Sequence, residues 1–189
     1  PKTVVAFETL TYKKIQIAVH AEIEDKDQTV YIPKVRTTAI ADDTKDHVTE
    51  AKKEVTIVDT VSYEGLEVDR EYTVKGVLMN KATGKVITVN GKEVTAETTF
   101  TAEKSEGSVD VIFTFDASAI APTTVVAFEH LEYKGIEIAV HEDIEDEDQT
   151  VYIPEIGTTA LGQDTEDHIE KAKDCLLYTS PSPRDKRQS

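Results

Sequence analysis

Several side chains that can transfer protons or react at a carbonyl are spread along this chain of 189 residues. Thr37 opens a Thr-Thr pair, Asp59 lies in an alternating segment, Glu129 ends an apolar run, and Gln149 lies eight residues after His141. A threonine hydroxyl is a poor nucleophile and a glutamine amide a poor electrophile, so they react only in contact and with proton transfer. An imidazole can be the base, and two close buried carboxyls share a proton because they do not both ionise cheaply.

Each of these residues also has a plainer interpretation. A lone histidine on a strand is usually a surface residue, and His141 is out of phase with the apolar residues at 136, 138 and 140, which favours exposure. Glu129 can simply end a strand. Gln149 lies in an acidic run, where solvated polar residues are expected. The residue types alone therefore leave a catalytic and a structural interpretation open.

Metal binding is a further alternative for the acidic run. Residues 142–148 contain six carboxylates, and calcium takes six to eight oxygen ligands. The run lacks the glycine and the fixed spacing of a known calcium loop, so a solvated face is the preferred interpretation. His47 and His168 have too few ligands nearby for a metal site and are interpreted as surface residues. No cofactor is expected.

An internal repeat decides the architecture. The segment TVVAFETLTYKKIQIAVHAEIEDKDQTVYIP, residues 3–33, recurs as TVVAFEHLEYKGIEIAVHEDIEDEDQTVYIP, residues 124–154, with 24 of 31 positions identical. The offset of 121 residues (124 − 3) is too long for a solenoid unit and is typical of whole domains in tandem. Glu8, His20 and Gln28 thus correspond to Glu129, His141 and Gln149, and Thr158 corresponds to Thr37.

This repeat predicts four segments. Residues 1–33 are the C-terminal part of an upstream repeat, 34–154 are one complete repeat, and 155–174 begin a third. Residues 175–189 open with CLLYTSPSPRD, which departs from the preceding composition and resembles translated sequencing-adapter DNA, so we expect this tail to be disordered and foreign to the fold. Cys175 is the one cysteine, so we expect no disulfide in the repeats.

Strand signals fill the complete repeat. Residues 54–61 alternate so that Val55, Ile57 and Asp59 share a face, and residues 109–115 alternate again. Asn90-Gly91 between short apolar segments predicts a hairpin with a type I′ turn. Further strands are expected at 72–79, 124–128, 136–140 and 150–153, and helix signals are weak. Seven or more short strands in about 120 residues favour an all-β, immunoglobulin-like sandwich.

The charge and the hydropathy of the chain argue against two kinds of partner, nucleic acid and the membrane interior. The formal charge of -16 argues against nucleic acid, whose phosphates would be repelled. No run of eighteen apolar residues occurs, so no membrane-inserting segment is expected in this stretch.

The segments RTTAIAD, VVAFE and HEDIEDEDQT, in this order and at repeat spacing, resemble the VaFE repeats of Gram-positive cell-surface proteins, the T-Q ester-bond domains. The resemblance covers residues 1–174. It implies an autocatalytic ester between Thr37, on the first strand, and Gln149, on the last strand, with release of ammonia. It also implies that His141, Asp59 and Glu129 assist the reaction.

The resemblance further implies a structural role. The expected function is that of a stalk segment in a cell-wall-anchored, extracellular adhesin, with neighbouring repeats as partners and a host or matrix ligand bound only through other domains. Such a domain is no turnover enzyme, since its cross-link forms once. Two alternatives remain open: a ligand-binding β-sandwich module and a calcium-dependent repeat.

Overall fold

The computed structural model describes residues 1–161, 166 and 168, and β-strands dominate this part of the chain. Its helical elements are three 3₁₀ turns, η1 (Lys26–Gln28), η2 (Ala117–Ala119) and η3 (Glu147–Gln149). Among the described residues no helix is long and apolar enough to cross a membrane. The all-β prediction is confirmed.

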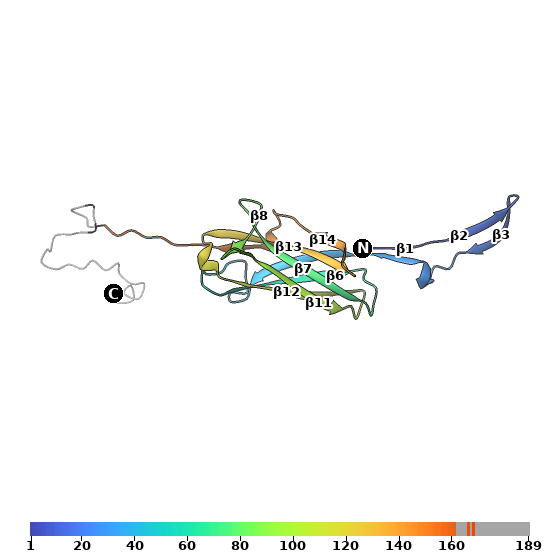
Figure 1. Cartoon of the computed structure of the whole chain (residues 1–189), viewed down its shortest axis with the longest axis horizontal. Helices are drawn as coiled ribbons and strands as arrows, with labels where there is room; N and C mark the ends of the chain where they lie inside the picture. Colours follow the sequence, from blue (N-terminus) through green and yellow to red (C-terminus); the bar gives the residue numbers. More distant parts are fainter. Residues whose placement is uncertain (162–165, 167, 169–189) are drawn as a thin grey trace, which may run out of the picture. The chain divides into compact units, whose positions relative to one another are not determined.

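Two antiparallel sheets form the body of the complete repeat (Figure 1). The smaller sheet has the order β12–β6–β5, formed by Glu106–Phe115, Val55–Glu64 and Lys34–Ala41. The larger sheet has the order β11–β7–β13–β14, formed by Thr95–Thr101, Glu71–Asn80, Thr123–Tyr133 and Ile136–His141. Strand β15 (Thr150–Ile153) pairs with β13, and β8 (Lys85–Val86) pairs with β7. The arrangement is the immunoglobulin-like sandwich that the strand pattern predicts.

Strand β13 organises the larger sheet because it is paired along both edges. One edge pairs with β7, whereas β15 and β14 share the other edge in succession. Thr150 lies opposite Val126, and His141 lies opposite Glu129. The chain between β14 and β15 therefore leaves this edge and returns to it within a few residues, which brings the η3 turn next to the middle of β13.

Alternation along the strands places the core between the sheets. In β6, Val55, Ile57 and Asp59 are buried on one face, as predicted. In β12, Val111, Phe113 and Phe115 are buried in the same way. Each of these side chains points inward because successive residues of a strand face opposite sides.

The predicted hairpin is present at the Asn90-Gly91 turn. It joins β9 (Thr88–Val89) to β10 (Lys92–Glu93), and both turn residues have positive φ, 52° and 77°. A type I′ turn requires these angles, which Asn and Gly tolerate with little strain.

A β-bulge overturns the expectation that His141 is exposed. The register shifts between Leu131 and Glu132, so that these neighbours face Ala139 and Glu137 and leave Ile138 as the extra residue. The bulge reverses the phase of the rest of β14. His141 thus shares the inner face with Ala139, and its side chain is 22% exposed.

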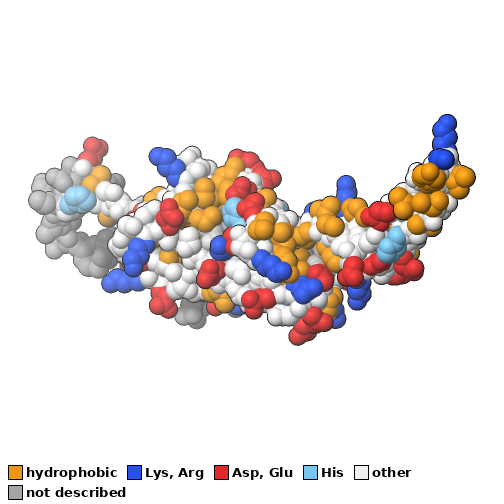
Figure 2. All heavy atoms as spheres, turned by 45° about the vertical axis from the view of Figure 1, so that its right-hand side comes forward, with side chains coloured by type: hydrophobic (Ala, Val, Ile, Leu, Met, Phe, Trp, Pro, Cys, Tyr) orange, Lys and Arg blue, Asp and Glu red, His pale blue; other side chains and the backbone are white. Residues whose placement is uncertain are grey.

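Residues 1–33 repeat the pairing of the β13–β15 segment. β1 (Lys2–Val5) pairs with β4 (Thr29–Ile32), and β2 (Glu8–Tyr12) pairs with β3 (Ile15–His20), in the registers of their counterparts. Leu10 is 60% exposed, whereas the corresponding Leu131 is 1% exposed. Figure 2 shows apolar side chains on the surface of this β2–β3 hairpin. Residues 124–154 are buried because the β12–β6–β5 sheet faces them, whereas residues 1–33 have no such sheet among the described residues and stay exposed.

The unit that begins at Ile156 is described only in part. Residues 156–161 form no regular secondary structure, and Thr158 is exposed. The predicted disorder of residues 175–189, including Cys175, and much of the predicted third repeat fall outside the described residues.

Candidate functional site

Thr37 and Gln149, which are 112 residues apart, meet between the two sheets. The side-chain amide Nε2 of Gln149, at the end of η3, donates a hydrogen bond to Oγ1 of Thr37, on β5. Both side chains are buried, with Thr37 at 6% and Gln149 at 0% exposure. Thr38 is exposed, because alternation along β5 turns it to the outer face. The contact therefore belongs to the first threonine of the pair.

Two buried carboxyls complete the centre of this site. Gln149 Nε2 also donates to Oε2 of Glu129, at 2.6 Å, from the facing strand β13. Asp59 of β6 lies close enough to Glu129 and to the Thr37 hydroxyl for both to affect its pKa. Neither carboxyl has any exposed surface. Four strands and turns distant in sequence thus place a hydroxyl, an amide and two carboxyls in mutual contact.

The carboxyl pair holds a proton at neutral pH. Burial, followed by the hydrogen bond and the charge of Asp59, raises the pKa of Glu129 to about 11. Burial also raises the pKa of Asp59, although its bond to Glu129 and the nearby His141 oppose this rise. Desolvation and the mutual repulsion of two carboxylates are the physical causes.

His141 stands at the margin of the pair. It lies directly across from Glu129 in the β13–β14 ladder, and its electrostatic influence lowers the pKa of Asp59. Its Nε2 atom lies 2.9 Å from Oδ2 of Asp146. The structure thus brings the imidazole to the same sheet position as the buried carboxyls, with one ring nitrogen held by an acidic partner.

Apolar side chains wall the site from water. Val111 lies opposite Asp59 on β12, and Gly76 lies opposite Glu129 on β7. A Cβ atom at Gly76 would stand 2.5 Å from Cζ of Phe113 and 3.1 Å from Cγ1 of Val111. The missing side chain lets Phe113 pack against Gly76, the residue opposite Glu129. Such dry packing raises the pKa of the carboxyls and excludes water as a competing nucleophile.

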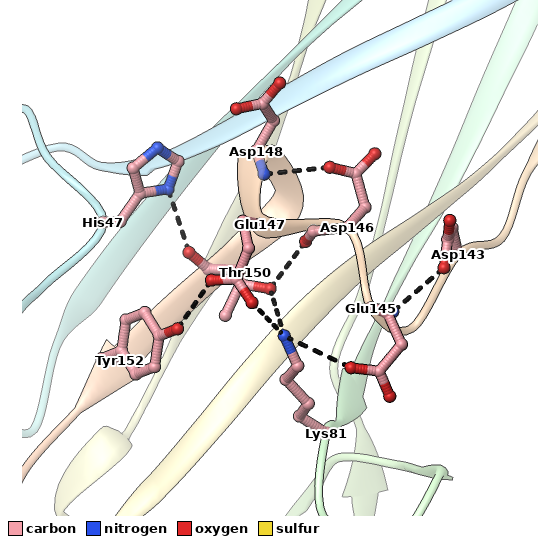
Figure 3. A network of polar contacts seen from close by, with 9 residues as sticks. All are labelled: His47, Lys81, Asp143, Glu145, Asp146, Glu147, Asp148, Thr150 and Tyr152. Atoms are coloured by element: carbon pink, nitrogen blue, oxygen red, sulfur yellow. Dashed lines mark hydrogen bonds and ion pairs between the residues drawn. The ribbon is translucent and has the colours of Figure 1, made fainter.

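A polar network holds Gln149 from outside (Figure 3). Lys81 Nζ lies 2.8 Å from Glu147 Oε1 and donates to Oγ1 of Thr150 at 3.3 Å. His47 Nδ1 contacts the Thr150 carbonyl oxygen at 2.9 Å, and its own carbonyl accepts from Tyr152 N at 2.7 Å. The residues on both sides of Gln149 are therefore tied to Lys81, just after β7, and to His47 in the β5–β6 connection.

His47 and Lys81 were missed by sequence reasoning. His47 was expected at the surface, yet it is half-buried and holds the backbone of β15. Its match to His168 in the next copy was the available signal. For Lys81, no pattern in the sequence indicated a partner 66 residues away.

The acidic run has structural partners. Asp143 and Asp146 each accept a bond from a backbone N–H two residues later, and Glu147 binds Lys81 and the Tyr152 hydroxyl. Within the described part of the chain, no group of three or more His, Cys, Asp or Glu side chains is arranged to hold a metal ion.

The family comparison agrees with this geometry. The family described as "T-Q ester bond containing domain" matches residues 1–32 and 33–153. The chain belongs to this family. No curated protein sequence matches the chain.

Solved structures show the same fold as this T-Q ester bond domain. A bacterial adhesin from Mobiluncus mulieris, described as containing intramolecular disulfide, isopeptide and ester bond cross-links, matches in two crystal forms. The TM-scores are 0.56 and 0.55 at 19% sequence identity, over 66% of this chain and 58% of the adhesin chain. The present chain thus spans little more than half of the adhesin structure.

The buried pair predicts how stability depends on pH. In a Thr37→Ala background, which keeps the chain unlinked, folded Glu129 retains a proton that unfolded Glu129 loses above its ordinary pKa of 4.5. The unfolding free energy should therefore fall as pH rises from that value toward about 11, by at most about 1.4 kcal/mol per pH unit.

Urea unfolding at about pH 6 and about pH 8 measures this slope. The double variant Thr37→Ala/Glu129→Gln is the matched control, and it should show a distinctly flatter dependence. Equal slopes in the two proteins would contradict the assignment of the proton to Glu129.

Proposed function

We propose that residues 34–154 form a self-locking structural domain of a bacterial surface adhesin, closed by an ester between Thr37 and Gln149. One observation carries this proposal: the buried Thr37 hydroxyl touches the Gln149 side-chain amide at a protonated carboxyl pair. Membership in the T-Q ester bond family supports it.

The reaction balances within the site. The Thr37 hydroxyl gives its proton to the His141 imidazole while its oxygen bonds to Cδ of Gln149. The C–N bond of the amide then breaks, and Glu129, whose carboxyl lies against Nε2, supplies the proton that lets ammonia leave. The His141 proton returns to the carboxyl pair. The products are one ester and one ammonia, and no cofactor takes part.

Because Glu129 contacts Nε2 of Gln149, it is placed to protonate the ammonia that leaves. The site consumes its own hydroxyl and amide, so it reacts once and turns over no substrate. Close approach in a dry site supplies most of the assistance, because effective molarities for well-oriented groups are very high. The same dryness protects the ester from hydrolysis afterwards.

The position of the bond suits a load-bearing role. Thr37 lies near the start of β5, the first strand of the complete repeat, and Gln149 directly precedes β15, the last strand of that repeat. Tension along the chain would enter at β5, cross through the ester and leave through β15, so the residues between them carry no load. By analogy with a disulfide, closing a loop of this length stabilises the fold by about 4–5 kcal/mol.

We extend this role to the whole protein as a proposal. The segment serves as a rigid spacer in a cell-wall-anchored, extracellular protein of a Gram-positive bacterium. Repeats before and after residues 34–154 are its neighbours, and a host or matrix ligand is bound by other domains.

Intact mass tests the ester. The folded chain should weigh about 17 Da less than its sequence mass, the loss of one ammonia. In this chain Gln28 lacks the counterpart of Thr37, and Thr158 lacks the counterpart of Gln149, so a single loss is expected. Thr37→Ala should restore the full mass, and Thr38→Ala should still show the loss. Full sequence mass for well-folded protein would contradict the proposal.

Single-molecule pulling tests the spacer role. With the ester in place, stretching residues 34–154 should release only the few residues outside the bond, roughly 30 Å. Thr37→Ala should instead unravel by about 400 Å, the reach of roughly 110 extended residues. Equal extension of both proteins would show that the link bears no load.

A further inference from the structure

A single residue joins residues 1–33 to the complete repeat. Strand β4 ends at Ile32, β5 begins at Lys34, and Pro33 lies between them. The two family matches also meet here, at residues 32 and 33. A proline ring fixes φ near about −65° and restricts the preceding residue to extended backbone. The joint therefore has little conformational freedom of its own, and residues 1–155 form one compact unit.

The loop between β6 and β7 contacts this joint. A Cβ atom at Gly65 would stand 2.7 Å from Cβ of Pro1, and 3.6 Å from both the Ile32 carbonyl oxygen and Cα of Pro33. A cavity of about 240 Å³ beside this contact is lined by both parts of the chain, residues 29–31 and 33 from one side and residues 65–67, 72, 133 and 138 from the other. The missing side chain of Gly65 thus lets the loop approach the end of the preceding segment closely.

Bonds within the complete repeat hold this loop in place. Leu66 is buried, and its N–H donates to the Ser105 carbonyl oxygen at 3.0 Å. The Tyr72 hydroxyl accepts from Glu67 N at 3.1 Å and donates to the Glu67 carbonyl oxygen at 3.2 Å. The Tyr72 ring packs against Tyr133, with centroids 5.3 Å apart. The loop is therefore preorganised as a surface against which another segment can dock.

Side-chain exposure at the joint supports such docking. Most apolar side chains of residues 1–33 are more exposed than their counterparts in residues 124–154. Tyr31 and Pro33 show the reverse, because both are half-buried whereas the corresponding Tyr152 and Pro154 are exposed. A complete repeat follows Pro33, whereas residues 155–161 form no regular secondary structure. The complete repeat therefore covers the end of the segment that precedes it.

We propose that the loop at residues 64–67 is a docking surface for the preceding repeat, so that consecutive repeats are joined stiffly. Pro122, Ile153 and Pro154, the counterparts of the three residues that Gly65 approaches, line a surface hollow of about 660 Å³ at the other end of the repeat. The partner of that hollow is the same loop of the following repeat. The inference rests on the tandem arrangement in the proposed function and is independent of the ester.

Backbone ¹⁵N relaxation of the full chain measures this docking. If the loop holds β4, the amides of the β1–β4 pair should have order parameters of about 0.85, the value of rigid backbone. The amides of β5 give the reference for the body of the repeat. Order parameters below about 0.6 in β1–β4, beside a rigid β5, would overturn the proposal.

Gly65→Asn should release the joint. Asn tolerates the positive φ of 79° at this position, but its Cβ would lie well inside the about 3.5–4.0 Å of an ordinary carbon contact with Pro1. The order parameters of β1–β4 should fall below about 0.6, while those of β5 stay unchanged. Gly91→Asn is the matched control, since φ is 77° and a Cβ there meets nothing within 4 Å. Equal rigidity of β1–β4 in both variants would contradict the proposal.

Tyr31→Ala leaves the complete repeat unaltered and gives a second test. Removal of the half-buried ring from the cavity should loosen β1–β4 in the same way. Tyr12→Ala is its control, because Tyr12 is 60% exposed in β2, and it should leave β1–β4 rigid. Rigid β1–β4 amides in Tyr31→Ala as well as in Gly65→Asn would refute the docking surface.

Intact mass separates this inference from the ester. Gly65 and Tyr31 lie outside the buried site, so both variants should still lose one ammonia, which also shows that the complete repeat has folded. Wild-type protein at full sequence mass with a rigid β1–β4 pair would refute the ester alone. Linked wild-type protein with a mobile β1–β4 pair would refute the docking surface alone.

Discussion

The contact between Thr37 of the smaller sheet and Gln149, in the η3 turn just before β15 of the larger sheet, is the constraint on which the rest of the domain depends. It exists because β14 and β15 occupy the same edge of β13 in succession, which forces the chain between them to turn beside Glu129. Burial then raises the pKa values of Asp59 and Glu129. Because Asp59 and Glu129 have no exposed surface, the pair keeps a proton that an exposed pair would lose.

The buried carboxyl that the reaction needs also reduces the stability of the fold. A buried, protonated glutamate lowers stability at neutral pH, since the unfolded chain would ionise freely. The packing of Phe113 over Gly76 and the network around Lys81 and His47 hold the site together in spite of that cost. An ester that joins Thr37 to Gln149 would offset this loss of stability. Residues 1–174 contain no cysteine that could supply a disulfide instead.

Much of the fold follows from local patterns in the sequence. Alternation along β6 correctly predicted that Asp59 is buried with Val55 and Ile57, and Asn90-Gly91 correctly predicted a hairpin. Both features depend only on residues that are neighbours in sequence. His141 was misplaced because one extra residue in β14, Ile138, reverses the phase, and no local pattern shows which residue bulges. The roles of Lys81 and His47 depend on partners far along the chain. The location of the shared proton depends on burial, which only the assembled sandwich defines.

Mapping the cross-link by peptide mass spectrometry tests the account most directly. Trypsin cuts after Arg36 and Lys45, and after Lys134 and Lys171, so Thr37 and Gln149 fall in two separate peptides of the denatured chain. The account predicts that these peptides stay joined, at about 17 Da less than their summed mass, with fragments that place the bond on Thr37 and Gln149. Recovery of both peptides as separate, unmodified species from folded protein would contradict it.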